Sequence, residues 1–166
     1  DVNGSGLTPY TGAISFVTDG VHSLDAQATD NAGHENYTGV VIQIDSVAPT
    51  LVPDVTGTTN GTTWFISVPT MTLNATDATS SVAGIGYTVN GGSLNLYTAP
   101  VNFTQDGVYA IQAIALDVAQ NTATESFQIA YDSTPPQLSI NLVGDKGENG
   151  WFVSPPTFVV TSSDAT

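Results

Sequence analysis

The chain repeats itself at an offset of 87 residues, and this repetition constrains the fold more than any other feature. The stretch DGVHSLDAQATDNAG at 19–33 returns as DGVYAIQAIALDVAQ at 106–120. WFISVPT at 64–70 likewise returns as WFVSPPT at 151–157, and the copies align without a gap. Self-similarity at a fixed period marks a chain built from one structural unit used several times. Each unit must therefore fold within about 87 residues.

Proline-containing segments separate the units. They lie around Pro49 and Pro135–Pro136 and interrupt strand-like patterns. Because proline has no N–H to donate to a β-ladder, we interpret both segments as linkers. We therefore expect the C-terminal part of one repeat at 1–45, a complete repeat at 46–132 and the N-terminal part of a further repeat at 133–166.

The complete repeat has the pattern of a β-structure. Apolar and polar residues alternate with a period of two at 71–77, 84–90, 108–117 and 126–132, and no useful helical period appears. Asn90-Gly91 is a strong hairpin signal. About seven short strands in a unit of this length are typical of a β-sandwich. We predict an all-β chain of tandem sandwiches.

The first copy indicates which side of one strand faces inward. Leu24, Ala26 and Ala28 align with the apolar side of 108–117, whereas their neighbours are polar. We expect these three side chains to face a core.

The charge balance excludes several classes of partner. One lysine, Lys146, and no arginine stand against 15 acidic residues, for a net charge of −14. Nucleic acid and anionic membrane surfaces are excluded, because both are bound through cationic side chains. No apolar run approaches the roughly 18 residues of a membrane-spanning helix, so we expect no direct membrane insertion. The absence of cysteine excludes disulfides and thiolate metal sites.

Sequons for N-linked glycosylation indicate a secreted glycoprotein. They occur five times as N-x-[S/T]. The alternative is that polar asparagines simply belong on the surfaces of these strands. The candidate glycosylation sites are Asn3, Asn36, Asn60, Asn74 and Asn102.

The repeat resembles the prokaryotic extracellular immunoglobulin-like repeats of surface-layer proteins, adhesins, surface filaments and multidomain secreted enzymes. The resemblance is carried by TDATSSVAGIGYTVNGG at 76–92, DGVYAIQAIALDVAQN at 106–121, YDSTPP at 131–136 and ATDNAGH at 28–34. It implies immunoglobulin-like sandwiches in an extracellular, cell-surface protein. Tyr109 resembles the tyrosine corner of such folds, although the first copy has His22 at that place.

In such a sandwich, the loops that follow 71–77 and 108–117 lie where the preceding linker enters. This arrangement implies that carboxylates of two successive repeats meet at their joint. At the first joint we expect Asp19, Asp45, Asp77 and Asp117. At the second joint we expect Asp106, Asp132 and Asp164.

Clustered carboxylates without a nearby Lys or Arg either raise their pKa values or bind a hard cation. Oxygen-only ligation suits Ca²⁺, so we consider these residues as interdomain calcium ligands. The alternative is that Asp77 and Asp117 accept hydrogen bonds from loop N–H groups, as aspartate commonly does in turns.

Two aromatic pairs and the histidines allow functional and structural interpretations. Trp64-Phe65 and Trp151-Phe152 could stack on sugars, but their equivalent places beside prolines favour packing between strands. His22 and His34 lie near no plausible nucleophile, and we expect structural roles for both.

We expect a non-enzymatic structural module, because no residue pair departs from the repeat as an active site would. Its setting would be a surface layer, a stalk or a fibre, with self-association and surface glycans or proteins as candidate partners. In one hypothesis, 133–166 of one copy complete the sandwich begun by 1–45 of the next, which gives head-to-tail assembly. We favour instead that the sequence is a stretch of a longer repetitive chain. The alternative functions are a ligand-binding adhesin module and a spacer domain of a large secreted enzyme.

Overall fold

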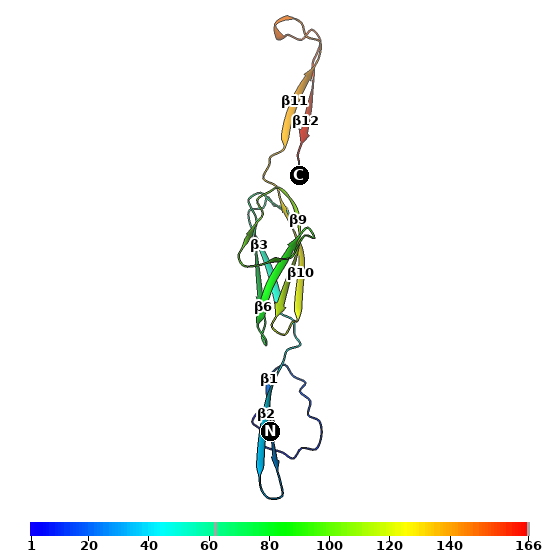
Figure 1. Ribbon diagram of the computed structural model, residues 1–166. Helices are drawn as coiled ribbons and strands as arrows, with labels where there is room; N and C mark the ends of the chain where they lie inside the picture. The colour runs from blue at the N-terminus through cyan, green and yellow to red at the C-terminus, as the bar shows by residue number, and fades with distance from the viewer. Residues whose placement is uncertain (62, 166) are drawn as a thin grey trace. The chain divides into compact units, whose positions relative to one another are not determined.

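The chain is all-β. The computed structural model describes residues 1–61 and 63–165, and 53% of the chain is in strands (Figure 1). Within these ranges no α-helix occurs. A three-residue 3-10 segment, η1 (Glu148–Gly150), is interrupted by Asn149, whose φ of 53° lies in the left-handed region. The predicted fold class is confirmed at this level.

Across the described ranges, the strands form four sheets. One antiparallel pair contains β1 (Gly20–Thr29) and β2 (Glu35–Ile44). A three-stranded sheet has the order β3 (Thr50–Thr56), β5 (Thr70–Thr76) and β8 (Val101–Asn102). A five-stranded sheet has the order β4 (Trp64–Phe65), β10 (Thr122–Tyr131), β9 (Gly107–Asp117), β6 (Val82–Val89) and β7 (Asn95–Leu96). A second antiparallel pair contains β11 (Gln137–Val143) and β12 (Thr157–Ser163).

The strand boundaries reproduce the sequence repeat. Moved by 87 residues, β2 coincides with β10, β11 with β3 and β12 with β5. The proline-containing segments at 45–49 and 132–136 contain no strand. This agrees with their interpretation as linkers, whereas the division into three parts stays a prediction.

By its contacts, the chain separates into two compact units. The first contains Asp1–Asp54, Thr72–Pro100 and Ile111–Phe127. Its buried apolar side chains alternate with exposed or half-buried neighbours along β3, β5 and β9, as the period-two pattern predicts. They are Leu51, Leu73, Ile111, Ala113 and Ala115.

The second unit contains Val55–Met71, Val101–Ala110 and Gln128–Thr166. Its buried core is formed by Met71, Phe103, Ile129 and Tyr131. The alternation predicted at 126–132 is thus confirmed at Ile129 and Tyr131, which are buried on either side of the half-buried Ala130.

The alternation is weaker in β6. Ile85 and Tyr87 are half-buried, and the buried residue is Gly86. A Cβ atom at Gly86 would lie 3.1 Å from Leu94 Cδ1 and 3.2 Å from the Asn95 carbonyl oxygen. Gly86 is therefore needed because the neighbouring segment approaches the backbone of β6 closely.

The expected inward side of the first copy is not buried. Ala26 and Ala28 are exposed, and only Leu24 is half-buried. β1 pairs with β2 alone in its sheet, and the segment at 7–14, which lies beside Leu24 and Ala26, leaves both alanines exposed.

The corner that Tyr109 makes is built twice, with different residues. The Tyr109 hydroxyl donates to the Gln105 carbonyl at 2.6 Å, and His22 Nε2 lies 2.8 Å from the equivalent Thr18 carbonyl. Because a carbonyl only accepts, Nε2 of His22 carries the proton. The rings of Phe103 and Tyr109 lie 4.7 Å apart, and those of the equivalent Phe16 and His22 lie 5.0 Å apart. His22 therefore replaces tyrosine in the same structural role.

Candidate metal site

Three aspartates from different segments converge in the first unit. Asp45 follows β2, Asp77 follows β5 and Asp117 ends β9. One carboxylate oxygen of each lies within 4.8 Å of the others. Asp117 is fully buried, and the other two are half-buried. We call these three residues the acidic triad.

Asp117 is held by Asn121, four residues later in the loop between β9 and β10. The Asn121 backbone N–H donates to Oδ1 at 2.8 Å, and its side-chain Nδ2 donates to Oδ2 at 2.9 Å. Both oxygens of the buried carboxylate therefore have a hydrogen-bond donor, which a buried charge requires.

Asp77 organises the loop between β5 and β6. Its Oδ1 accepts hydrogen bonds from the backbone N–H groups of Thr79, Ser80 and Ser81 at 3.0, 2.9 and 3.0 Å. This is the turn-capping arrangement expected of aspartate at the end of a strand. The bonds described for Asp77 all go to Oδ1, which leaves its Oδ2 as the oxygen best able to take a further partner.

Asp45 connects the end of β2 to the same loop. Its Oδ1 accepts from the Val47 N–H at 3.1 Å, and its Oδ2 accepts from the Ser80 N–H at 3.1 Å. Hydrogen bonding by Ser80 is the largest cause that lowers the pKa of Asp45, and the Val47 N–H adds to it. Asp45 therefore favours the charged form that a metal ligand needs.

Asn121 joins these segments. Besides Asp117, its Nδ2 group donates to the Asp45 carbonyl at 3.1 Å and lies 3.4 Å from the Val47 carbonyl. One amide group thus ties the loop after β9 to the segment that follows β2. The sequence did not single out Asn121, because the other copy has His34 in its place.

The spacing and chemistry of the triad fit a hard cation. Ca²⁺ binds oxygen ligands at about 2.3–2.6 Å, so opposite ligands lie about 4.8 Å apart. The sequence holds no arginine, and its one lysine, Lys146, lies 5.8 Å from the centre of the Phe152 ring. The partly buried triad could therefore hold a metal ion such as Ca²⁺. Its bonds to loop N–H groups also match the turn-capping alternative.

Asp19 does not join the triad, in contrast to the expected group of four. Its carboxylate accepts from the Ser46 N–H at 3.1 Å and from the Ser46 hydroxyl at 3.0 and 3.1 Å. The repeated Asp-Ser dipeptide, at 45–46 and 132–133, could have revealed this pairing.

The second expected group does not assemble among the described residues, where the triad is the one cluster of at least three possible ligands. Asp106 accepts from the Ser133 N–H and hydroxyl, both at 2.9 Å, and from the Thr134 hydroxyl at 2.6 Å. Asp132 accepts from the Thr134 N–H at 2.9 Å, and Asp164 accepts from the Ala165 N–H at 2.7 Å. Asp106 therefore connects the start of β9 to the segment that follows β10, and Asp132 caps the turn that begins with it.

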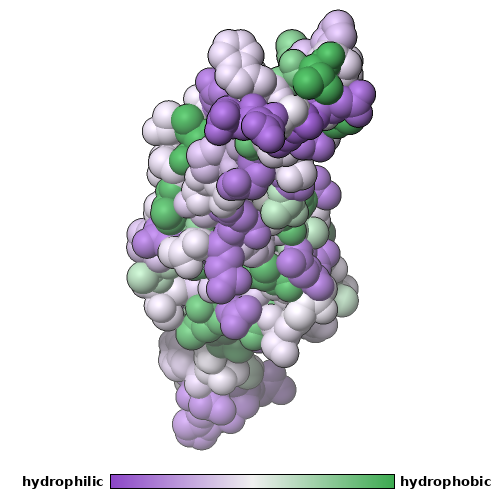
Figure 2. All heavy atoms as spheres, turned by 90° about the horizontal axis from the view of Figure 1, so that it is seen from above, coloured by the Kyte–Doolittle hydropathy of each residue, from purple (hydrophilic) through white to green (hydrophobic). Residues whose placement is uncertain are grey.

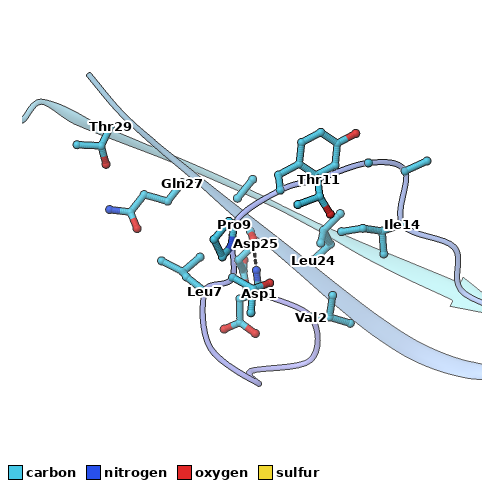
Figure 3. Close-up of a pocket in the computed structure, with 15 residues that line it drawn as sticks. Asp1, Val2, Leu7, Pro9, Thr11, Ile14, Leu24, Asp25, Gln27 and Thr29 are labelled. Carbon is cyan, nitrogen blue, oxygen red and sulfur yellow. Dashed lines mark hydrogen bonds between the residues drawn. The ribbon is translucent and has the colours of Figure 1, made fainter. Parts of the chain in front are cut away.

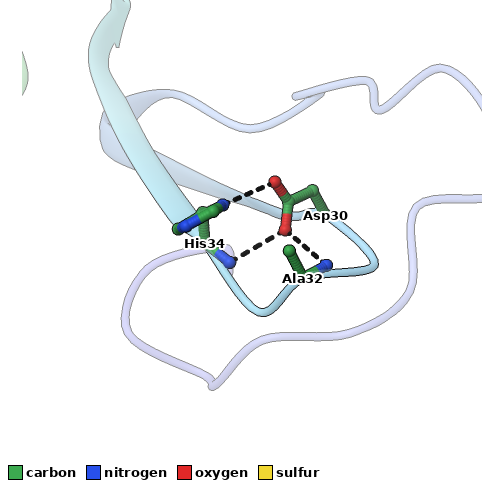
Figure 4. A network of polar contacts seen from close by, with 3 residues as sticks. All are labelled: Asp30, Ala32 and His34. Carbon is green, nitrogen blue, oxygen red and sulfur yellow. Dashed lines mark hydrogen bonds and ion pairs between the residues drawn. The ribbon is translucent and has the colours of Figure 1, made fainter.

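Asp30 and His34 repeat the loop geometry of Asp117 and Asn121. Asp30 Oδ1 accepts from the N–H groups of Ala32 and His34 at 2.8 and 2.9 Å, and His34 Nδ1 lies 2.8 Å from Oδ2 (Figure 4). The His34 side chain is the largest cause that lowers the pKa of Asp30. His34 therefore has a structural role, as the sequence predicts.

The candidate glycosylation asparagines are all exposed. Asn3 lies in a turn, where its Oδ1 accepts from the Ser23 N–H at 2.8 Å and its Nδ2 lies 3.4 Å from His22 Nδ1. Asn102 Oδ1 accepts from the Thr70 hydroxyl at 2.8 Å. Asn36 and Asn74 lie within β2 and β5. The sequon of Asn60 depends on Thr62, which lies outside the described residues.

The two aromatic pairs differ in exposure. Trp64 and Phe65 are half-buried, and β4 pairs in parallel with Ala130 and Tyr131 of β10, which matches the expected packing between strands. Trp151 is 77% exposed. Figure 2 shows hydrophobic residues at the molecular surface among hydrophilic ones.

No protein-family model matches the chain, and no characterised protein was found to match its sequence. Among the described residues, no helix is long and apolar enough to cross a membrane.

Proposed function

We propose that the chain is a non-enzymatic structural module of an extracellular surface protein, built from tandem immunoglobulin-like sandwiches. The supporting observation is the contact between the end of β2 and the loops after β5 and β9. Asn121 and Ser80 reach Asp45 from those loops, so successive repeats are joined by specific hydrogen bonds. A joint of this kind limits the bending of a tandem chain.

In this proposal, Ca²⁺ binds the acidic triad and stiffens the joint. Three carboxylates with no cationic side chain among them repel one another, and a divalent cation would remove this repulsion. Loop carbonyls and water would complete a shell of about 6–8 oxygens.

Calcium titration with thermal unfolding tests this proposal. The melting temperature of the wild-type chain should rise with Ca²⁺ concentration, because a ligand of the folded state stabilises it. Asp77→Asn should lose this response yet remain folded, since an amide oxygen still accepts from the three loop N–H groups. Asp54→Asn removes an exposed carboxylate of β3 and should respond as the wild type does. If the melting temperature of the wild type did not change at millimolar Ca²⁺, the metal proposal would be refuted. The aspartates would then act only as acceptors for loop N–H groups.

We also propose head-to-tail assembly with a second copy of the chain. Leu51 and Leu73 are 6% and 2% exposed, whereas their counterparts Leu138 and Val160 are 69% and 51% exposed. In the middle repeat, residues equivalent to β1 and β2 belong to the buried core. The exposed side of β11 and β12 is therefore suited to the β1–β2 pair of another copy.

Sedimentation of the 166-residue chain over a range of concentrations tests the assembly. Leu138→Asp should reduce self-association without unfolding, because Leu138 is already exposed in the single chain. Val17→Asp places the same charge at a residue that is 88% exposed and should have no effect. A wild-type chain that stays monomeric at high concentration would refute head-to-tail assembly, and it would favour a longer chain that completes its own repeats.

A further inference from the structure

The five-stranded sheet of the middle repeat has an outward side, opposite the side that lines the core. In β9, the buried residues alternate with Gln112, Ile114 and Leu116, which therefore point outward. The ladder continues this side across the sheet, because Ile114 pairs with Gly86 of β6 and Gly86 pairs with Leu96 of β7. Residues of three strands thus share one outward surface.

This outward surface is rich in aliphatic side chains. Leu94 and Leu96 are 66% and 73% exposed, and Ile114 and Leu116 are half-buried. Leu94 lies over Gly86, where an added Cβ atom would lie 3.1 Å from Leu94 Cδ1. We call Leu94, Leu96, Ile114 and Leu116 the aliphatic face.

The surroundings of the aliphatic face are uncharged. By alternation, the outward residues described in β6, in β9 from Ile111 on and in β10 up to Phe127 include no ionisable side chain. The outward neighbours are Gly84, Thr88, Gln112, Thr122, Thr124 and Ser126. Glu125 of β10 falls on the other side by the same alternation. In a chain with a net charge of −14, this surface is therefore neutral.

The same side of the first copy is polar. Ile114 of β9 corresponds to Gln27 of β1. Leu116 corresponds to Thr29. Both polar residues border a cavity of about 770 Å³ beside β1 (Figure 3). The aliphatic face is thus a departure of the middle repeat from the repeated pattern.

The strand pair folds without aliphatic residues at these places. In the first copy, Gln27 Nε2 donates to the Tyr37 hydroxyl at 2.9 Å, and that hydroxyl donates to the Glu35 carboxylate. The loop between β1 and β2 nevertheless has the same geometry as the loop between β9 and β10. Because the fold does not require Ile114 and Leu116, their outward position is explained by a molecule that covers them.

We propose that the aliphatic face binds the aliphatic face of a second copy of the chain. The net charge selects this occupant. Two chains of charge −14 repel each other, and they approach at the lowest electrostatic cost where neither carries an ionisable group. A cationic partner would find no carboxylate at this face. Since both copies contribute the same residues, the contact is isologous and closes after two chains.

This contact uses neither β11 nor β12, so it is independent of the head-to-tail assembly proposed above. Where both contacts form, each chain has one face-to-face neighbour. The expected assembly is therefore a pair of fibres.

Sedimentation equilibrium of Leu138→Asp isolates the face-to-face contact, because this variant removes the proposed head-to-tail contact. With increasing concentration, its mass should rise from 17.1 kDa toward twice that value. NaCl should favour the dimer, since screening weakens repulsion between acidic chains. EDTA should not change it. A chain that stays monomeric at about 1 mM in high salt would overturn the proposal. Dissociation by EDTA would also overturn it, because cations would then bridge the chains.

A charged substitution locates the contact. In the Leu138→Asp chain, Leu96→Asp places a carboxylate on the aliphatic face and should weaken the dimer by more than about tenfold. Because Leu96 is 73% exposed, the fold should be unaffected. Val52→Asp adds the same charge to β3 of the other sheet, at a residue that is 54% exposed, and should have no such effect. Equal dimerisation of the two variants would refute this location.

A second variant transfers the residues of the first copy. Ile114→Gln combined with Leu116→Thr should leave the chain folded, as thermal unfolding can verify, and should abolish the dimer. If the folded double variant dimerises as well as its parent, the aliphatic side chains do not form the contact and the proposal is wrong.

Spin labels test the orientation of the two copies. The sequence contains no cysteine, so one introduced cysteine carries a single label. Labels on Thr124→Cys of β10 should lie closer together in the dimer than labels on Asp54→Cys of β3, as measured by double electron–electron resonance. Labels on Thr124→Cys that are equally far apart or farther apart would show that the copies meet by another surface, against the proposal.

Discussion

Replacement of Asn121 by alanine should destabilise the first unit more than any other single change to an amide side chain there. Asn121→Ala leaves Oδ2 of the fully buried Asp117 without the donor at 2.9 Å. It also removes the donor to the Asp45 carbonyl at 3.1 Å. A lost hydrogen bond to a charged group accounts for about 1.5–3 kcal/mol, and a neutral one for about 0.5–1.5 kcal/mol. The expected total loss of unfolding free energy is about 2–4.5 kcal/mol.

A second variant separates the two bonds. Asn121→His should behave as His34 does in the first copy, where Nδ1 lies 2.8 Å from Asp30. The histidine Nδ1 therefore restores the bond to Asp117. Unlike the amide Nδ2 of asparagine, it carries a single N–H and cannot also donate to the Asp45 carbonyl. We expect its stability to lie between those of the wild type and Asn121→Ala.

Thermal unfolding followed by circular dichroism measures these losses, since each kcal/mol lowers the melting temperature of a domain of this size by roughly 4–8 °C. Asn36→Ala removes an exposed amide of β2 and serves as the control, which should leave the melting temperature unchanged. A loss of less than about 0.5 kcal/mol for Asn121→Ala, the range of ordinary surface changes, would refute the roles assigned to the Asn121 amide. Equal losses for Asn121→Ala and Asn121→His would show that the bond to Asp117 contributes nothing.

Three further predictions concern other turns and close contacts. The Thr134 hydroxyl, followed by Ser133, lowers the pKa of Asp106 below its ordinary 3.8. The stability that the Asp106 carboxylate contributes is therefore complete above pH 3.8 and is lost as the pH falls through the lowered pKa. In acid, the melting temperature of the wild type should therefore converge with that of Asp106→Asn. Tyr109→Phe removes the hydroxyl that donates to a backbone carbonyl and should lose about 0.5–1.5 kcal/mol in urea unfolding; no loss would show that the corner bond is unimportant. Gly86→Val should lose about 1–3 kcal/mol by overpacking, and a variant as stable as the wild type would show that the neighbouring segment moves aside freely.

The sequence predicted the places of Asp77 and Asp117 in the acidic triad, but it did not predict the partner of Asp19. Asp77 and Asp117 end strands whose period-two pattern is clear, so their place at one end of the repeat follows from local structure. Asp19 was expected beside them because it lies near the same joint, yet Ser46 occupies its carboxylate. Whether the Asp19 carboxylate bonds to the Ser46 hydroxyl or joins Asp77 and Asp117 depends on distances in space. A sequence pattern does not contain these distances.

By itself, the sequence determined the period of the repeat, the all-β class and the places of the longer strands. These properties are local: they depend on alternation along a strand and on turn residues that recur in each copy. Only the tertiary structure decided which carboxylates meet, that Asn121 links the loop after β9 to Asp45, and that a cavity lies beside β1. Each of these depends on segments that are distant in the sequence but adjacent in the fold, because hydrogen bonds and packing act over a few ångströms of space.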